Sequence, residues 1–279
     1  MHARSVPPAA LGLSGRRDLH LAGSLPPPPR LAVVGSRAAH RHLRDAVEPL
    51  VHAAGRRGWS IVSGGAVGVD ADAHAAALQA GIPQLAILPC GPDRAYPPQH
   101  VPLLEHIVQS GSGVLYAHPP GTEPTRGMFA SRNAIVVALA DAVVVVEAAP
   151  RSGTMLTATL ARRRGRPRAA VSGSTGAAVL QAEGAHALPW DPEQPAALMR
   201  AVDGWLRGIE RGEVPAPAPS RVAWPEHLQW LRDAIDAAGP TGLRVEALPS
   251  PRAALVALTE AEARGLVVEP SPGRFLRAG

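Results

Sequence analysis

The sequence has no lysine, one cysteine and few aromatic residues, and each scarcity excludes something. A P-loop needs the motif G-K-[ST], so ATP hydrolysis of that type is excluded. Cys90 alone can form neither an internal disulfide nor a thiolate metal cluster, and we expect it to be a small buried side chain at a strand end. Aromatic residues make up 3% of the chain, which predicts that base stacking contributes little to any nucleic-acid binding.

Long uninterrupted apolar runs are also absent. The longest, Ala134 to Ala149, is broken by Asp141 and Glu147, which predicts no membrane span. The N-terminus carries Arg4 and several prolines with no long apolar core behind them, so no signal peptide is expected. These features together predict a cytoplasmic protein.

Arginine supplies all of the basic charge. The 28 basic residues exceed the 23 acidic ones, which gives a formal net charge of +5 and favours a polyanionic partner. With 279 residues, of which 46% are apolar, the chain can bury the core of one large and one small domain.

The stretch from Trp59 to Gly81 combines a strand, a glycine-rich turn and a helix. Ile61 and Val62 end an apolar run, and Asp70 is placed to cap the helix that follows. The turn supplies Ser63, Gly64, Gly65 and Gly68. Because backbone amides at a helix N-terminus attract anions, this pattern predicts a phosphate site. The alternative is a structural turn in which the glycines only permit unusual backbone angles.

Two other strand ends carry loops of the same kind. Residues 35–37 follow the strand 30–34, and residues 151–154 follow the β-branched strand 142–147. Further strands are predicted at 85–89, 114–116 and 169–171, with helices up to about Arg57, from Val101, and over 128–140. This alternation predicts an α/β fold with a doubly wound parallel sheet, whose strand-end loops should converge where ligands collect.

The chain divides into four expected segments. Residues 1–29 are predicted to be an extended, proline-rich lead-in, 30–207 the sheet domain, 208–221 a proline-alanine linker and 222–279 a small domain. The small domain should contain helices at 225–238, 243–248 and 251–264, then strands at 266–269 and 274–277. Three helices and a two-stranded ribbon are typical of a winged helix, which binds either duplex DNA or proteins.

The sequence lacks the motifs of dinucleotide-binding proteins, metal sites and serine nucleophiles. The glycines at 64, 65 and 68 do not spell G-x-G-x-x-G, and no acidic residue lies between Asp72 and Asp93, so we expect no NAD or other cofactor. The histidines lack metal-ligand spacing. Ser63 and Ser152 lack a nucleophile context and are better suited as hydroxyl donors to phosphate. His74 either lies near the anion site or is satisfied by local packing.

Five motifs together resemble the DNA-processing protein A family, DprA or Smf, over about residues 25 to 279. They are AVVGSR (32–37), IVSGGAVGVDADAHAAAL (61–78), AILPCGPDRAYPPQH (86–100), FASRNAIVVALADAVVVVEA (129–148) and SGTMLTATLA (152–161). The resemblance implies a Rossmann-like core that binds single-stranded DNA without known catalysis. It further implies a homodimer that protects incoming DNA and loads the RecA recombinase in natural transformation.

The same resemblance places the DNA contacts. The implied DNA- and phosphate-binding residues are Gly35, Ser36, Arg37, Ser63, Gly64, Gly65, Gly68, Asp70, His74, Arg132, Asn133, Ser152, Gly153, Thr154, Thr157, Arg163 and Arg164. The chain departs from the family pattern at Ala130, where a proline is usual, and at Ala134, where an arginine is usual.

Two alternatives remain open. The core also resembles lysine-decarboxylase-like phosphoribohydrolases, which cleave nucleoside monophosphates with a glutamate after Gly-Thr. Here Gly153-Thr154 is followed by Met155, and Glu147 is the nearest acid. The second alternative is a nucleotide-sensing scaffold in which the winged helix docks proteins.

Overall fold

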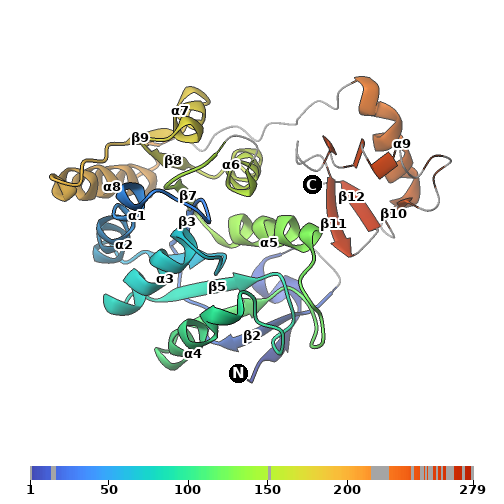
Figure 1. Cartoon of the computed structure of the whole chain (residues 1–279), viewed down its shortest axis with the longest axis horizontal. Helices are drawn as coiled ribbons and strands as arrows, with labels where there is room; N and C mark the ends of the chain where they lie inside the picture. The colour runs from blue at the N-terminus through green and yellow to red at the C-terminus, as the bar shows by residue number, and fades with distance from the viewer. Residues whose placement is uncertain are drawn as a thin grey trace.

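The computed structural model describes residues 2–13, 17–149, 152–214, 226–239, 242–245, 267–271, 274–277 and parts of 248–261. A nine-stranded sheet, in the order β1-β2-β6-β5-β4-β3-β7-β8-β9, forms its centre (Figure 1). The strands are β1 (Arg4–Val6), β2 (Leu19–Gly23), β3 (Arg30–Val34), β4 (Ser60–Ser63), β5 (Gln84–Leu88), β6 (Gly113–Tyr116), β7 (Ala142–Val145), β8 (Arg168–Val171) and β9 (His186–Leu188). From β3 the chain runs through β4 and β5 to β6, then returns to β7 beside β3 and continues through β8 to β9. This order confirms the predicted Rossmann-like, doubly wound parallel sheet.

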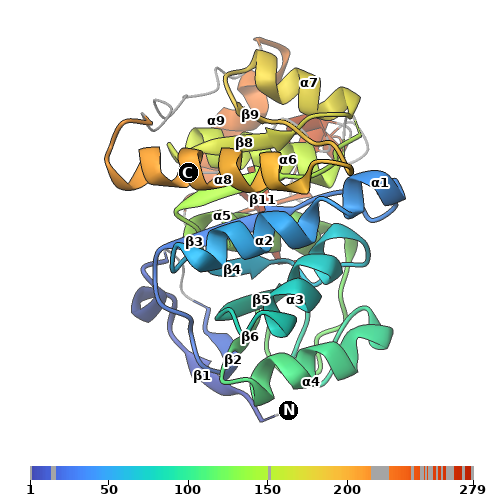
Figure 2. The ribbon, with the colours of Figure 1, turned by 90° about the vertical axis from the view of Figure 1, so that its left-hand side faces the viewer.

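Helices cover both faces of the sheet. They are α1 (Arg41–Arg44), α2 (Val47–Arg56), α3 (Val69–Gln79), α4 (Val101–Gln109), α5 (Arg126–Leu139), α6 (Gly153–Arg163), α7 (Thr175–Ala182) and α8 (Pro195–Glu210). One core packs α2, α3 and α8 against the sheet around Leu50, Ile61 and Trp205, on the side that faces the viewer in Figure 2. A second core packs α5, α6 and α7 against the other face, around Val137 and Leu180.

Local sequence explains why the central strands form. β7 is Ala-Val-Val-Val with every residue buried, as expected for a parallel strand covered on both faces. Pro97 and Pro98 precede α4, which begins at Val101 after a 3-10 turn at Pro98–His100. Pro102 lies in the first turn of α4, where proline is tolerated. None of the helices within the described ranges is long and apolar enough to cross a membrane.

The N-terminal prediction was wrong. Residues 1–29 do not form a lead-in outside the domain, because β1 and β2 extend the sheet as an antiparallel pair beside β6. Val6, Leu19 and Leu21 are buried in the core around α5. β1 is the edge strand of the sheet, and β2 lies between β1 and β6.

The C-terminal module is smaller and separately cored. It contains η3 (Glu226–Leu228), α9 (Gln229–Ala238), and a sheet of β10 (Leu243–Arg244), β12 (Arg274–Arg277) and β11 (Val267–Ser271). The helical piece predicted at 243–248 begins instead as strand β10, because Leu243 pairs with buried Phe275. The predicted helix 251–264 lies partly outside the described residues, so the winged helix stays a prediction. β11 lies beside α5 (Figure 1).

Candidate nucleic-acid interface

The loops after β3 and β4 meet at the carboxyl edge of the sheet. A Cβ atom on Gly68 would lie 2.5 Å from the Ser36 carbonyl oxygen and 2.9 Å from that of Arg37, so only glycine allows this approach. Gly68 has a φ of +81°, which also favours glycine. The glycine-rich turn therefore has a structural role, because Gly68 permits the close approach of the two loops.

Helix α3 begins two residues earlier than the predicted cap at Asp70 implies. It starts at Val69 with Gly68 as the N-cap, and no side chain caps it. The Asp70 carboxylate instead turns back into the glycine-rich loop and accepts a hydrogen bond from the Ala66 amide at 3.3 Å. Asp70 thus occupies the Ala66 amide, which is one of the amides that the sequence had suggested for a phosphate. The phosphate site at this turn stays a prediction.

Asp70 also faces a buried arginine. The Arg132 Nη1 atom lies 3.6 Å from Asp70 Oδ2, and both side chains are more than 90% buried. Burial raises the pKa of Asp70, against the opposing effects of Arg132 and the Ala66 amide, and burial lowers the pKa of Arg132. Gly64 makes room for this pair, because a Cβ there would sit 1.1 Å from Arg132 Nη1.

A hollow of about 320 Å³ opens beside Arg132. It is lined by Arg37, Gly64, Ala66, Val67, Pro89, Tyr96, Pro97, Pro98, Gln99, Phe129 and Arg132. The Arg37 guanidinium carbon lies 4.7 Å from the centre of the Phe129 ring, a cation–π contact. The Tyr96 and Phe129 rings meet edge to face at 5.8 Å. The hollow therefore combines two positive charges with two aromatic rings.

The two aromatic residues were missed by the sequence reasoning. The low aromatic content suggested that stacking contributes little, yet the fold brings Tyr96 and Phe129 to the same hollow, and Tyr96 is 41% exposed. One sequence signal could have found Phe129, because it precedes Arg132 by three residues and so shares its helix face. Nothing local to Tyr96 indicated its partner.

Two predicted contact residues are buried in the core instead. The Ser63 hydroxyl donates to the Val33 carbonyl at 2.7 Å, so it is not offered to a ligand. His74 is fully buried, with its Nδ1 atom 2.6 Å from Gln84 Oε1, and burial lowers its pKa to about 4. The packing alternative for His74 is the correct one.

The turn before α6 uses its polar groups internally. Ser152 accepts from the Met155 amide, and Thr157 donates to the Gly153 carbonyl at 3.0 Å. Thr154 is buried, while Asn133 on α5 donates to the same Gly153 carbonyl at 3.4 Å. These residues link α5 to α6 but do not line the hollow. Arg151 lies outside the described residues.

Arg163 and Arg164 are not beside that turn. They lie at the other end of α6, about 15 Å from Gly153 at 1.5 Å of rise per residue. Arg164 Nη1 donates to the Ala134 carbonyl on α5 at 2.9 Å. The expectation that both arginines border the phosphate pocket was wrong, because helix length separates them from it.

Glu147, the carboxylate considered for hydrolysis, is already engaged. Its Oε2 atom accepts from the His40 amide at 2.7 Å, and Oε1 lies 3.1 Å from His40 Nδ1. Glu147 is 8% exposed and does not line the hollow. Its contacts hold the residue that precedes α1 rather than present an acid to a ligand.

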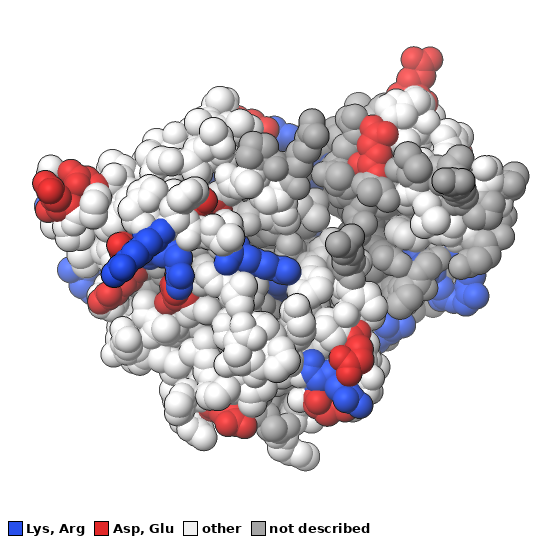
Figure 3. Space-filling model, viewed as in Figure 1, with Lys and Arg blue, Asp and Glu red and all other residues white. Residues whose placement is uncertain are grey.

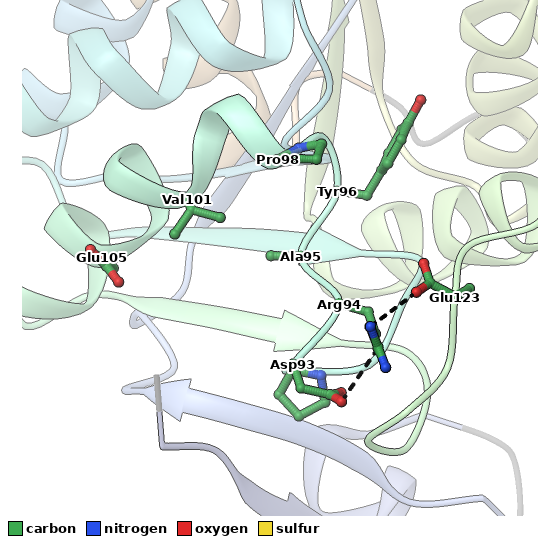
Figure 4. Close-up of a pocket in the computed structure, with 9 residues that line it drawn as sticks. Asp93, Arg94, Ala95, Tyr96, Pro98, Val101, Glu105 and Glu123 are labelled. Carbon is green, nitrogen blue, oxygen red and sulfur yellow. Dashed lines mark ion pairs between the residues drawn. The ribbon is translucent and has the colours of Figure 1, made fainter.

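A second hollow of about 420 Å³ adjoins the first and is acidic (Figure 4). Arg94 lies between Asp93 and Glu123, with ion-pair distances of 3.6 and 3.4 Å. Glu105 adds a third carboxylate to the lining, and Tyr96 and Pro98 line both hollows. The positively charged hollow is therefore bounded on the Tyr96 side by a surface that disfavours phosphate.

Acidic side chains are unevenly distributed over the face of the molecule seen in Figure 3. In Figure 3, basic groups near the centre have no acidic group in contact, whereas those at the lower right lie among acidic side chains. Within the described residues, no three His, Cys, Asp or Glu side chains lie close enough to hold a metal ion.

The chain matches one family model and several known proteins. Residues 7–200 match the model of DNA recombination-mediator protein A. The chain is 45% identical to a putative DNA processing protein DprA of Mycobacterium tuberculosis over 147 residues, covering 52% of this chain and 37% of that protein. It is 33% identical to Protein Smf of Escherichia coli over 227 residues, covering 81% and 54%. The chain thus spans about half or less of the length of these relatives.

Two solved structures share the fold. DNA processing protein A from Helicobacter pylori, described for its single-stranded DNA binding mode, has a TM-score of 0.62 and 26% identity, covering 74% of this chain and 96% of that one. DprA from Streptococcus pneumoniae has a TM-score of 0.56 and 34% identity, covering 61% and 62%.

Proposed function

Because the chain belongs to the DNA recombination-mediator protein A family, we propose that it binds single-stranded DNA in the hollow beside Arg132. The observation that carries the proposal is the meeting of Arg37, Arg132, Tyr96 and Phe129 in one hollow. A strand offers phosphates and unpaired bases together, and this lining has a partner for each. The H. pylori relative, described as a single-stranded DNA binder, supports the same reading.

The arginines supply the phosphate contacts in this proposal. Arg132 is buried and ion-paired only loosely with Asp70, and its Nε atom has no hydrogen-bond partner among the described residues. A phosphate in the hollow would balance the charge of this guanidinium, and the low polarity around it strengthens a charge-assisted hydrogen bond. Arg37 is exposed and reaches the same hollow from the β3 loop.

The aromatic rings supply a contact that does not depend on base identity. A base stacked on Tyr96 or Phe129 presents its π-face, which every base has, so binding should tolerate any sequence. The fixed cation–π contact of Arg37 with Phe129 orders both side chains before a strand arrives.

The biological role follows from the family and is part of the proposal. The protein would protect incoming DNA in natural transformation, act as a homodimer and load the RecA recombinase onto the strand. Its action would be binding without bond cleavage, which agrees with the engagement of Glu147 by His40.

The test compares Arg37→Ala and Phe129→Ala with Arg56→Ala, whose exposed side chain lies on α2 away from the hollow. We expect Phe129→Ala to weaken binding of any single-stranded oligonucleotide by about 1–3 kcal/mol. Arg37→Ala should also weaken binding to all sequences, and Arg56→Ala should not. Fluorescence anisotropy measures affinity, and RecA filament formation on the same strands reports loading.

Wild-type affinity in both hollow variants would refute the proposal. Release of free base from nucleoside monophosphates would instead favour the phosphoribohydrolase alternative. Retained folding with no DNA binding by the wild type would favour the scaffold alternative.

A further inference from the structure

Two loops that are distant in the sequence form facing walls of the hollow. Residues 89–100, here called the Tyr96 loop, run from the end of β5 to the start of α4. Figure 4 shows this loop passing through Tyr96 and Pro98, both in the lining, before it enters α4. The glycine-rich turn forms the other wall with Gly64, Ala66 and Val67. The two walls must keep a fixed separation if one strand is to contact the ring and the guanidinium groups together.

The His100 side chain joins these two walls. Its Nδ1 atom lies 2.9 Å from the Gly65 carbonyl oxygen. Because a carbonyl oxygen only accepts, Nδ1 carries the proton and donates this hydrogen bond. Within the part of the chain that the structure describes, no other hydrogen bond connects the Tyr96 loop with residues 63–68. The link between the walls therefore depends on one imidazole.

Neither helix capping nor burial accounts for this contact. His100 is the N-cap residue of α4, a position whose side chain often accepts a hydrogen bond from the first turn, yet its ring makes no such bond. The ring is only partly buried, so water could satisfy Nδ1 if Gly65 did not. The contact is better explained by the two loops that it connects.

Gly65 is a fixed point on the wall that supports Arg132. It follows Gly64, whose lack of a side chain makes room for the Arg132 guanidinium. A Cβ on Gly65 would lie 2.7 Å from Cδ2 of Leu88, the fully buried last residue of β5. The Gly65 backbone thus packs directly on the sheet, and a loop fastened to its carbonyl is held relative to the sheet.

We propose that His100 is a positioning residue for single-stranded DNA binding, because it holds the Tyr96 loop against Gly65 and so sets the place of the Tyr96 ring relative to Arg132. The inference rests on the proposed function, in which a base stacks on the ring and a phosphate meets the guanidinium. His100 does not line the hollow, so it acts through the loop and not by touching a nucleotide. Holding the loop before a strand arrives reduces the conformational entropy that binding must remove.

The test compares two substitutions of His100 in the full chain. His100→Leu removes the donor, whereas His100→Asn keeps a donor, Nδ2, at the same number of bonds from the backbone. The matched controls are His106→Leu and His106→Asn, because His106 is exposed on α4 and lines neither hollow. Fluorescence anisotropy measures affinity for an oligodeoxythymidine strand of about 4 nucleotides at several salt concentrations, with thermal unfolding of each variant.

We expect His100→Leu to weaken binding about fivefold, the effect of one lost hydrogen bond, and His100→Asn to restore most of the affinity. The log-log salt slope should keep its wild-type value, because the phosphate contacts remain. The His106 variants should bind as the wild type does.

A double-mutant cycle separates positioning from general stability. In a Tyr96→Ala background, His100→Leu should cost little further affinity, because the ring that it positions is gone. In an Arg37→Ala background, the fivefold loss should persist.

Other outcomes overturn the inference in distinguishable ways. Wild-type affinity in His100→Leu refutes the positioning role and leaves the hollow as proposed. The same loss in the Tyr96→Ala background, with a lowered unfolding temperature and no rescue by His100→Asn, shows that His100 serves stability alone. Failure of the wild type to bind the strand refutes the proposed function itself.

Discussion

At the scale of single residues, the candidate site depends on one buried ion pair. Arg132 comes to the hollow through its contact with Asp70, 62 residues earlier in the chain. Burying two charges costs free energy that a 3.6 Å pair without a short hydrogen bond recovers only in part. The pair is therefore better explained by what it positions, a guanidinium with spare donors, than by the stability it adds.

His74 makes the stability of the protein dependent on pH. Burial lowers its pKa from 6.5 to about 4, so the unfolded chain binds a proton between these values and the folded chain does not. The stabilisation is present above pH 6.5 and is lost as the pH falls towards 4. We expect this group to lower the free energy of unfolding by about 2 kcal/mol between pH 7 and pH 5. Urea unfolding of the wild type and His74→Gln at both pH values measures it.

In the His74→Gln variant, the difference between pH 7 and pH 5 should be smaller by that amount. Burial lowers the pKa of His118 too, so some pH dependence should remain in the variant. An identical difference in both proteins would show that the His74 proton is not linked to folding.

At the scale of elements, the β4–α3 turn helps to position Arg132. Its glycines permit the approach of the β3 loop and of Arg132, and its Ala66 amide is taken by Asp70. The turn also contributes Gly64, Ala66 and Val67 to the lining of the hollow. The same strand-turn-helix pattern thus contributes to the hollow by positioning a cation from another helix.

Gly64→Ala tests this role of the turn. The new Cβ would overlap the Arg132 guanidinium, at 1.1 Å from Nη1, and would approach Asp70 Oδ2 at 2.7 Å. The end of the arginine must move, so we expect affinity for a short single strand to fall at least tenfold, or about 1.4 kcal/mol. The control is Gly204→Ala on α8, which has open space and should bind normally. Equal binding by both variants would contradict the role of Gly64.

At the scale of the whole molecule, the positive charge is unevenly distributed. Residues 222–279 contain six arginines and seven acidic residues, so the net charge of +5 comes from the part of the chain that holds the sheet. Sequence-independent attraction of a polyanion should therefore belong mainly to that part. The C-terminal module is less suited to this attraction, although its β11 lies beside α5.

The salt dependence of the affinity for single strands measures how many phosphates the protein contacts. With three to five phosphate contacts per protomer, the log-log salt slope for single strands should be roughly −2 to −3.5. Phe129→Leu should lower affinity without changing the slope, because stacking releases no counterions. Arg37→Gln should reduce the magnitude of the slope by about 0.7. A slope near zero in the wild type would refute the phosphate-based mode.

Local sequence pattern predicts some elements, whereas others form only through pairing with distant parts of the chain. Runs such as Ala142–Val145 and Arg30–Val34 are rich in apolar and β-branched residues, so their strands could be predicted from local pattern, and the alternation with helices predicted their parallel order. The short strands at 4–6 and 19–23 could not, because only pairing with β6 makes them strands. The same reason explains the error at Leu243, where pairing with Phe275 overrides local preference.

The sequence by itself determined the doubly wound sheet, the family and the presence of Arg37 and Arg132 among the candidate residues. Only the tertiary structure decided that Asp70 holds Arg132, that Tyr96 joins Phe129, and that Arg164 lies far along α6 from Ser152. The physical reason is that hydrophobic periodicity specifies which face of an element is buried. Contacts between residues distant in the chain depend instead on how those faces pack and how long each helix runs.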